Sequence, residues 1–373
     1  MMWLIIIGSL ILMVAGGIAY LTFRSAKFSF VQKISRGKRW LARLICLGFF
    51  ISLTSLLYIL MNLMNALVCL IHLVIFWMIC DLTGWIVSLI RKKKAHRYWA
   101  GAAAILLCVV YLAYGWYSAH HIRQQSYQLE TEKGTGHLRI VQISDSHLGT
   151  TFHADKFGTY IDQINALSPD VVVITGDFVD DDTSREDMLS GCGALGKLQT
   201  KYGVFFVFGN HDKGYNSESS RGWSGRELKE QLEANNVIVL QDDVRLIDGR
   251  FYIVGRRDRS EEQRGNGRIE ADQLLGELDH DEYIIVLDHQ PYDFEAEAAA
   301  GADLVLCGHT HGGQLIPIRH VGEWIGENAL RYGYERIGGT DFIVTSGIGS
   351  WAIRFKTGCW SEYVAIDIRQ ERR

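Results

Sequence analysis

Long apolar runs dominate the first third of the chain, whereas short ones separated by polar and glycine-rich segments fill the rest. Four of the long runs reach the roughly 20 residues that a helix needs to cross a bilayer. They cover Trp3–Phe23, Leu41–Leu60, Leu67–Ile90 and Trp99–Tyr117. The two middle runs form a block too long for a single crossing, so we expect the chain to double back near Asn62 and Asn65. The pattern predicts a transmembrane region of about four helices over residues 1–118.

Basic residues support this count of spans. Seven Lys or Arg side chains lie in 24–43, between the first two runs, and the segment Arg91–Arg97 before the fourth run is also basic. Short cytoplasmic loops carry an excess of positive charge. Two crossings between these loops put both in the cytoplasm and everything after Tyr117 outside it. A cleaved signal peptide is the alternative for Met1–Phe23, but the segment lacks the basic start of such peptides.

Asp81 lies deep inside the third apolar run, with His72 nine residues earlier. An ionisable side chain at that depth is costly and by default indicates a functional role. The alternative is a polar contact that holds the helices together or lines a wet crevice. Four of the seven cysteines lie in the apolar runs, where they are expected as small buried hydrophobic residues. The three outside are an odd number without metal-ligand spacing, so no disulfide framework is expected.

A polar linker is expected over residues 119–137, and beyond it short β-rich runs alternate with helical ones. The clearest expected strands are Leu138–Ile143, Val171–Thr175, Val204–Phe208, Tyr283–Leu287 and Asp303–Cys307. Expected helices include Lys156–Leu167, Arg226–Glu233 and Ile269–Leu278. The alternation predicts an α/β domain over residues 138–373, long enough to bury its own core.

Each of these five strands is followed by polar residues of the same few types. The sequences that follow them include Asp145-Ser146-His147, Gly176-Asp177, Gly209-Asn210-His211-Asp212, Asp288-His289 and Gly308-His309-Thr310-His311. Ligands bind at the carboxyl ends of strands in open α/β sheets. One such histidine would mean little, because structural histidines are common. Five endings built from Asp, Asn and His predict a metal site.

The residue types restrict the kind of metal site. Carboxylate, amide and imidazole groups without thiolates disfavour a structural zinc cluster. Seven candidate ligands are too many for one tetrahedral ion. They suit two ions about 3.5–4 Å apart, which clamp both oxygens of an in-line phosphoryl displacement. Manganese, iron, zinc and cobalt all accept such ligands.

The order of these motifs, D-x-H, G-D, G-N-H-D, H and G-H-x-H, resembles that of the calcineurin-like metallophosphoesterases. The last motif, Gly308–Gln314, reads G-H-T-H-G-G-Q and is most similar to a membrane-associated bacterial branch of that family. The resemblance covers roughly His137 to Ile368. It implies a two-sheet β-sandwich flanked by helices, with two divalent metal ions, manganese favoured, at one sheet edge.

The resemblance also implies roles for individual residues. The implied ligands of one metal are Asp145, His147, Asp177 and His311. Those of the second metal are Asp177 as a bridge, Asn210, His289 and His309. By the same resemblance, His211 stabilises the transition-state oxygens or protonates the leaving group. Asp180 stands where some relatives hold the acid that orients this histidine, with Asp212 as a turn or capping residue.

Other segments are less specific. Relatives often carry Pro-Glu near the C-terminus, where this chain has Ser361-Glu362, so the local loop is expected to differ. Two segments have open roles: each either caps the site, contacts lipid headgroups or is a mobile solvated loop. They are Lys213–Arg226, which contains Trp223, and Gly255–Arg268. Aromatic residues that either lie at the membrane interface or pack in the core are Trp324, Tyr332 and Tyr334.

The net charge of the predicted domain and its tether to the membrane restrict the class of substrate. Up to Gln124 the chain has 13 Lys or Arg and one acid, a balance of +12, whereas the remainder has 25 basic and 41 acidic residues, a balance of −16. So acidic a domain should repel polyanions, which makes nucleic acid a poor partner. Its tether to the lipid bilayer favours a membrane-proximal substrate, and we predict a lipid-linked phosphate ester, phosphodiester or pyrophosphate. The bond would be hydrolysed by attack of a metal-bound hydroxide.

Two alternatives stay open. One is a hydrolase of a soluble extracytoplasmic phosphoester, with the spans as an anchor. The other is a non-catalytic membrane sensor or scaffold with a vestigial metal site, against which the intact ligand set argues.

Overall fold

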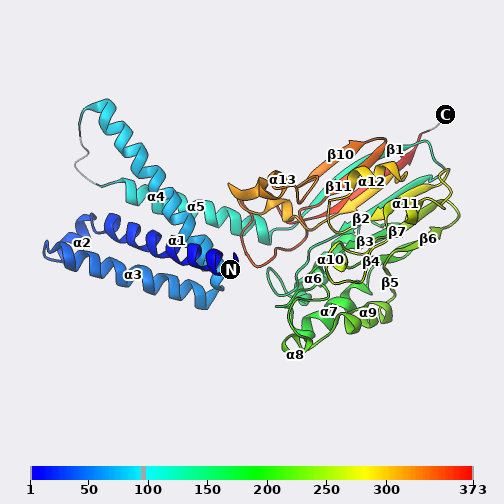
Figure 1. The fold of residues 1–373 in the computed structure, drawn as a ribbon, viewed down its shortest axis with the longest axis horizontal. Coiled ribbons are helices and arrows are strands. Elements are labelled where there is room, and N and C mark those ends of the chain that lie inside the picture. The colour runs from blue at the N-terminus through cyan, green and yellow to red at the C-terminus, as the bar shows by residue number, and fades with distance from the viewer. Residues whose placement is uncertain (1, 94–97, 372–373) are drawn as a thin grey trace. The chain divides into compact units, whose positions relative to one another are not determined.

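A computed structural model describes residues 2–93 and 98–371, with side chains described from residue 12 onward (Figure 1). The chain divides into two compact units, Met1–Gly115 and Trp116–Arg373. The second unit therefore begins within the last turns of a helix of the membrane region.

The first unit is helical. Its helices are α1 Met2–Ser25, α2 Ser29–Ile34, α3 Arg39–Leu60, α4 Leu63–Arg91 and α5 Ala100–His120. Within the described part of the chain, three of them, α3, α4 and α5, are long and apolar enough to cross a membrane. The chain turns back at Asn62, whose side chain accepts a hydrogen bond from the Asn65 backbone N–H at 2.8 Å, so Asn65 lies inside α4 rather than in the turn. Of the basic segment Arg91–Arg97, residues 94–97 lie outside the described part of the chain.

Asp81 of α4 has several polar partners within this unit. It forms an ion pair with Arg24 and accepts hydrogen bonds from the Tyr20 hydroxyl at 2.6 Å and the Tyr98 hydroxyl at 2.8 Å. His72 is also paired, because its Nδ1 lies 2.8 Å from the Val68 carbonyl oxygen. The contacts of Asp81 connect α1, α4 and the residue Tyr98 just before α5, which is the arrangement of a polar contact that holds helices together.

The second unit is a mixed α/β fold with two six-stranded sheets among its described residues. The first sheet contains β1 Arg123–Thr131, β12 Glu362–Gln370, β2 His137–Ile143, β3 Val171–Thr175, β4 Val204–Val207 and β5 Val237–Leu240, in that order. The second contains β10 Gly333–Ile337, β11 Thr340–Val344, β9 Leu304–Cys307, β8 Tyr283–Leu287, β7 Phe251–Gly255 and β6 Asp243–Ile247. All five expected strands are present, with bounds within one residue of the expected ones.

Alternating side chains place the two sheets in layers. Val171 and Phe205 of the first sheet share one buried cluster with Ile285 and Leu306 of the second, so the sheets pack face to face. The opposite face of the first sheet is covered by α6 Ala154–Asn165, α7 Arg185–Leu195 and α9 Gly225–Ala234. The outer face of the second is covered by α11 Ala271–Leu275 and α12 Phe294–Ala299. The remaining short helices are α8 Glu218–Arg221, α10 Ser260–Gln263, α13 Val321–Trp324, η1 His311–Gly313 and η2 Ile318–His320.

The expected linker over 119–137 is wrong. Residues Arg123–Thr131 form β1, which pairs in parallel with β12 along its whole length, from Arg123 opposite Glu362 to Thr131 opposite Gln370. The error has a physical reason: β1 is an edge strand of which Leu129 alone is buried, so its sequence is nearly as polar as a loop. The helix expected over Ile269–Leu278 is also shorter than predicted, since α11 covers Ala271–Leu275.

Candidate metal centre

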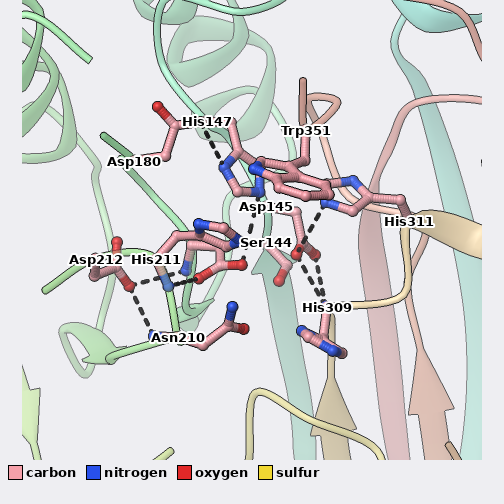
Figure 2. Close-up of polar contacts among 12 residues, drawn as sticks. Ser144, Asp145, His147, Asp180, Asn210, His211, Asp212, His309, His311 and Trp351 are labelled. Atoms are coloured by element: carbon pink, nitrogen blue, oxygen red, sulfur yellow. Dashed lines mark hydrogen bonds and ion pairs between the residues drawn. The ribbon is translucent and has the colours of Figure 1, made fainter. Parts of the chain in front are cut away.

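The polar residues after the five expected strands meet at one place (Figure 2). Strands β2, β3 and β4 are parallel neighbours in the first sheet, and β8 and β9 are parallel neighbours in the second. Because the two sheets pack on each other, the carboxyl ends of all five strands supply one centre from two sheets. The sequence alone predicted the convergence but not its division between two sheets.

The backbone at this centre is strained. Five candidate ligands have positive φ angles although none is glycine: Asp145 (53°), His147 (40°), Asp177 (52°), His309 (69°) and His311 (49°). Such conformations are uncommon for residues with a side chain and cost of order 1–3 kcal/mol each. Strain of this kind persists where the surrounding structure fixes it, and it clusters at functional sites.

One group of candidate ligands is Asp145, His147 and His311, whose ligand atoms all lie within 4.8 Å of one another. His311 Nε2 lies 3.8 Å from Asp145 Oδ1, and the rings of His147 and His311 are 5.0 Å apart between centroids. All three residues are buried. Asp145 is also fixed by the backbone N–H of His309, which donates to its Oδ1 at 2.9 Å.

A second group is Asp177, His289 and His309, again with ligand atoms within 4.8 Å. His289 Nε2 lies 3.1 Å from Asp177 Oδ2 and 3.1 Å from the Asn210 side-chain oxygen. The other ring nitrogen, Nδ1, lies 2.7 Å from the Thr175 carbonyl oxygen, which fixes the ring and leaves Nε2 facing the centre.

Asp177 lies between the two groups. Its Oδ2 atom is 3.1 Å from His289 Nε2 of the second group and 3.6 Å from His147 Nε2 of the first. Its other oxygen accepts the His211 backbone N–H at 2.8 Å. A carboxylate approached from two sides by imidazoles in this way is placed where a bridge between two ions would be.

The unpartnered atoms of the centre fit divalent cations. His147 Nε2, His309 Nδ1 and His311 Nδ1 are buried without a hydrogen-bond partner among the described residues, which is costly unless another group binds them. Burial and the nearby His289 lower the pKa of His309 to about 3. Burial and the charge of His147 lower the pKa of His311 well below its ordinary value. Both imidazoles are thereby kept neutral, which is the form that binds metal.

The carboxylates are affected in opposite directions. Burial raises the pKa of Asp145, and the charge of Asp177 adds to this shift. For Asp177, burial acts in the same direction, but the charges of His289 and His147 and the hydrogen bond from His289 hold its pKa well below the ordinary value. Asp177 is therefore ionised at neutral pH and carries the negative charge that a pair of cations requires.

Comparisons with known proteins agree with this geometry. Residues 138–313 match the model of the calcineurin-like phosphoesterase family. An uncharacterized metallophosphoesterase of Aquifex aeolicus is 31% identical over 66% of this chain and 91% of its own length. The chain belongs to the calcineurin-like phosphoesterases. These are metal-dependent phosphoester hydrolases, and the family fold implies a dinuclear divalent metal site.

Other calcineurin-like relatives are longer than the matched region. An uncharacterized metallophosphoesterase of Campylobacter jejuni is 28% identical over 63% of this chain and 60% of its own length. A transmembrane protein with metallophosphoesterase domain from Danio rerio is 32% identical over 62% of this chain and 53% of its own length. The chain therefore spans between a half and two thirds of the length of these two relatives.

Asp212 does more than the expected turn or capping residue, because it holds together two loops of the calcineurin-like centre. Its buried carboxylate accepts four backbone N–H groups, from Asp177 (2.9 Å), Phe178 (2.8 Å), Val179 (3.1 Å) and Gly209 (2.7 Å). It thus joins the loop after β3 to the loop after β4. The two loops also touch directly, since a Cβ atom on Gly209 would lie 2.6 Å from the Asp177 backbone nitrogen. A larger residue at position 209 would displace Asp177.

Asp180 has a different partner from the expected one. Its Oδ2 lies 3.0 Å from His147 Nδ1, and the bond is drawn in Figure 2, so Asp180 orients a candidate metal ligand rather than His211. The hydrogen bond and charge of His147 lower the pKa of Asp180 against the effect of burial. The loop that holds Asp180 is closed by Thr183, whose side-chain oxygen accepts the Asp180 backbone N–H at 2.9 Å.

We expect Asp180→Asn to weaken metal binding about 10–100-fold, because a carboxylate that orients a ligating histidine is worth that much affinity. The measurement is a chelator titration of the metal-loaded protein, followed by metal analysis. Asp182→Asn, two residues away, is the matched control. If the hydrolysis rate at full metal occupancy changes while metal binding does not weaken, Asp180 orients His211 instead.

His211 belongs to neither group and lines an open depression of about 540 Å³. Its ring centroid lies 5.1 Å from those of both Tyr215 and Trp351, which line the same depression. Burial lowers the pKa of His211 below its ordinary value. The sequence analysis did not single out Trp351, and it included Tyr215 only as part of the possible capping segment Lys213–Arg226. The Asn210 side-chain nitrogen donates to the Tyr215 hydroxyl at 2.9 Å.

The two loops with open roles, Lys213–Arg226 and Gly255–Arg268, both have side chains that are buried away from the site. Trp223 is buried and donates from Nε1 to the Thr183 carbonyl oxygen at 2.9 Å, so it packs in the core rather than over the site. Arg256 and Arg268 are also buried, where they pair with Asp288. Both loops also reach the centre: Tyr215 of Lys213–Arg226 accepts a hydrogen bond from the Asn210 side chain, and Arg264 of Gly255–Arg268 donates to the Asn210 carbonyl oxygen at 3.2 Å.

At Ser361, where relatives often carry proline, hydrogen bonds hold the loop in place. The Ser361 hydroxyl donates to the Ala119 carbonyl oxygen at 2.9 Å, which connects the loop to the end of α5. Glu362 accepts the Tyr332 hydroxyl at 2.8 Å, and Tyr334 donates to Asp341 at 2.8 Å. Both tyrosines therefore have polar partners inside the unit, whereas Trp324 is exposed.

Proposed function

We propose that this protein is a membrane-anchored phosphoesterase that uses two divalent metal ions to hydrolyse a phosphate ester, phosphodiester or pyrophosphate bond of a membrane-proximal, lipid-linked substrate. The observation that carries the proposal is Asp177, placed between two groups of buried Asp and His side chains beside an open depression. Asp145, His147, Asp177 and His311 would hold one ion, and Asp177, Asn210, His289 and His309 the other.

Each part of the centre has a chemical task. When bound, the two cations supply Lewis acidity and lower the pKa of water towards neutrality. Asp177 fixes the two groups of ligands relative to each other. Asp180 fixes the ring of His147, and the Thr175 carbonyl oxygen fixes the ring of His289. The His211 ring lines the depression, where it can donate to a phosphoryl oxygen or to the leaving group.

The membrane arrangement is part of the proposal. We take α1 as a fourth span beside α3, α4 and α5, with the basic segments around 24–43 and before α5 in the cytoplasm. The end of α5 and the catalytic unit that follows it then lie on the extracytoplasmic side. An ion pair and hydrogen bonds that tie α1 to Asp81 support a retained α1, because its removal would leave Asp81 without Arg24 and Tyr20.

His211→Gln should lower kcat by about 10²–10⁴-fold, the range for loss of a general acid or base, with both metals retained. His280→Gln, an exposed histidine of the same unit, is the matched control. The measurement combines metal analysis with hydrolysis of bis(4-nitrophenyl) phosphate. Loss of metal in His211→Gln would contradict a role confined to the substrate.

The proposal as a whole is tested on the full chain in nanodiscs. Metal analysis should give two divalent ions per chain, and activity should be screened against lipid phosphates, lipid phosphodiesters and lipid pyrophosphates. Turnover of one lipid class with a lower KM than its water-soluble headgroup supports the lipid-linked substrate. Metal-loaded protein that hydrolyses no monoester, diester or pyrophosphate would refute the enzymatic proposal.

A further inference from the structure

An exposed apolar segment follows the candidate metal ligand His311 within the same unit. Over residues 316–325, which contain η2 and α13, five large apolar side chains are between 40% and 74% exposed: Ile316, Ile318, Val321, Trp324 and Ile325. We call this segment the apolar lip. Large apolar groups gathered on a water-exposed surface mark an interaction site.

The lip borders the depression of the metal centre. Gly313 and Gln314 line that depression and lead directly into the lip. The lip folds back on this point, because a Cβ atom on Gly313 would meet the Arg319 carbonyl oxygen and lie 2.7 Å from the Arg319 Cα. Leu315 between them is buried and anchors the segment. The position of the lip is therefore coupled to the position of the site.

The lip is also connected to the end of α5, all within the second unit. The Ile316 backbone N–H donates to the Thr357 hydroxyl at 3.0 Å, and the Thr357 N–H donates to the Gln314 carbonyl oxygen at 2.9 Å. Three residues later the Trp360 ring packs edge-on against Tyr117 of α5, with centroids 5.7 Å apart. Ser361 then donates from its backbone N–H to the Ser118 carbonyl oxygen at 3.1 Å.

We propose that the apolar lip lies in the interfacial layer of the lipid bilayer into which α5 runs, so that the metal centre opens at the level of the lipid headgroups. The bilayer is the occupant because the lip is connected, through residues 357–361, to the end of a candidate membrane span. Tryptophan beside branched aliphatic side chains is the composition that enters this layer. The inference deepens the proposed function, since it states where a lipid-linked substrate is taken up.

The experiment measures where the lip lies in the full chain reconstituted into nanodiscs of phosphatidylcholine and phosphatidylglycerol. A nitroxide is attached at Ile325→Cys and, as the matched control, at Leu246→Cys on β6, which is 51% exposed and lies outside the lip. The native cysteines are buried or partly buried, so a parallel sample without the introduced cysteine corrects for their labelling. Collision rates are measured with lipid-soluble oxygen and with a water-soluble nickel chelate.

The expected result is a shift at position 325 towards collision with oxygen and away from nickel, with the opposite preference at position 246. A nitroxide at Ile318→Cys should show the same shift and lose it when Trp324→Ser and Ile325→Ser are introduced. Equal nickel accessibility at positions 325 and 246 would overturn the proposal. Protection of position 325 from both reagents would also overturn it, because it indicates cover by protein.

This readout is independent of turnover. If the accessibility shift is found but no phosphoester is hydrolysed, the proposed function fails and the membrane position of the lip stands. If hydrolysis is found without the shift, the lip proposal fails alone. Hydrolysis of bis(4-nitrophenyl) phosphate by each labelled variant, at the rate of the unlabelled protein, verifies that the metal centre is intact.

Discussion

Asp177→Ala is expected to abolish hydrolysis and to leave at most one metal ion per chain. The residue contacts His289 at 3.1 Å and His147 at 3.6 Å through the same oxygen, so its removal affects both groups of ligands. Charge stabilisation by metal ions is worth several kcal/mol, which corresponds to about a thousandfold or more in kcat. The measurements are metal content by mass spectrometry and the hydrolysis of bis(4-nitrophenyl) phosphate.

Asp155→Ala is the matched control, because it removes an exposed carboxylate from α6. A readout besides activity is the metal-dependent rise in melting temperature, since ligands that bind only the folded state stabilise it. In Asp177→Ala this rise should shrink, and in Asp155→Ala it should persist. Two tightly bound ions in Asp177→Ala would contradict the bridging position.

The strand ends could be predicted from sequence because their signal is local. The buried strands β3, β4, β8 and β9 are almost wholly apolar runs, and an Asp, Asn or His that the ligand chemistry needs follows each of them within three residues. The parallel arrangement then brings these residues together whichever sheet they belong to. The bounds of β3 and β8 were predicted to the residue for the same reason.

Features that depend on partners distant in sequence could not be predicted. β1 becomes a strand only by pairing with β12, more than 200 residues later, and its polar sequence has no period that identifies it. Trp223 lies in a Gly- and Ser-rich segment, yet it is buried against Thr183. Asp180 bonds to His147 because the loops after β2 and β3 lie side by side. In each case tertiary contact decides what local composition leaves open.

Asp212 is the strongest example, and it yields the second large effect. Asp212→Ala removes the acceptor of four buried backbone N–H groups, including that of Asp177. Each buried donor left unsatisfied costs about 1–3 kcal/mol, so the unfolding free energy of the catalytic unit should fall by at least about 3 kcal/mol. Because total stability is about 5–15 kcal/mol, this is a large fraction of it.

The isosteric variant Asp212→Asn separates hydrogen bonding from packing. Its amide nitrogen would face backbone donors, so a hydrogen-bonding role predicts that Asp212→Asn is nearly as destabilised as Asp212→Ala, while a packing role predicts little change. The measurement is differential scanning calorimetry of the full chain in detergent micelles. The transition of the catalytic unit is identified by its shift when Mn²⁺ is added, and Asp162→Asn, which changes an exposed carboxylate of α6, is the control.

Both Asp212 variants should also bind metal more weakly, because the loops that carry Asp177 and Asn210 lose the carboxylate that joins them. An Asp212→Ala protein with the stability and metal content of the control would show that the two loops hold their positions without it.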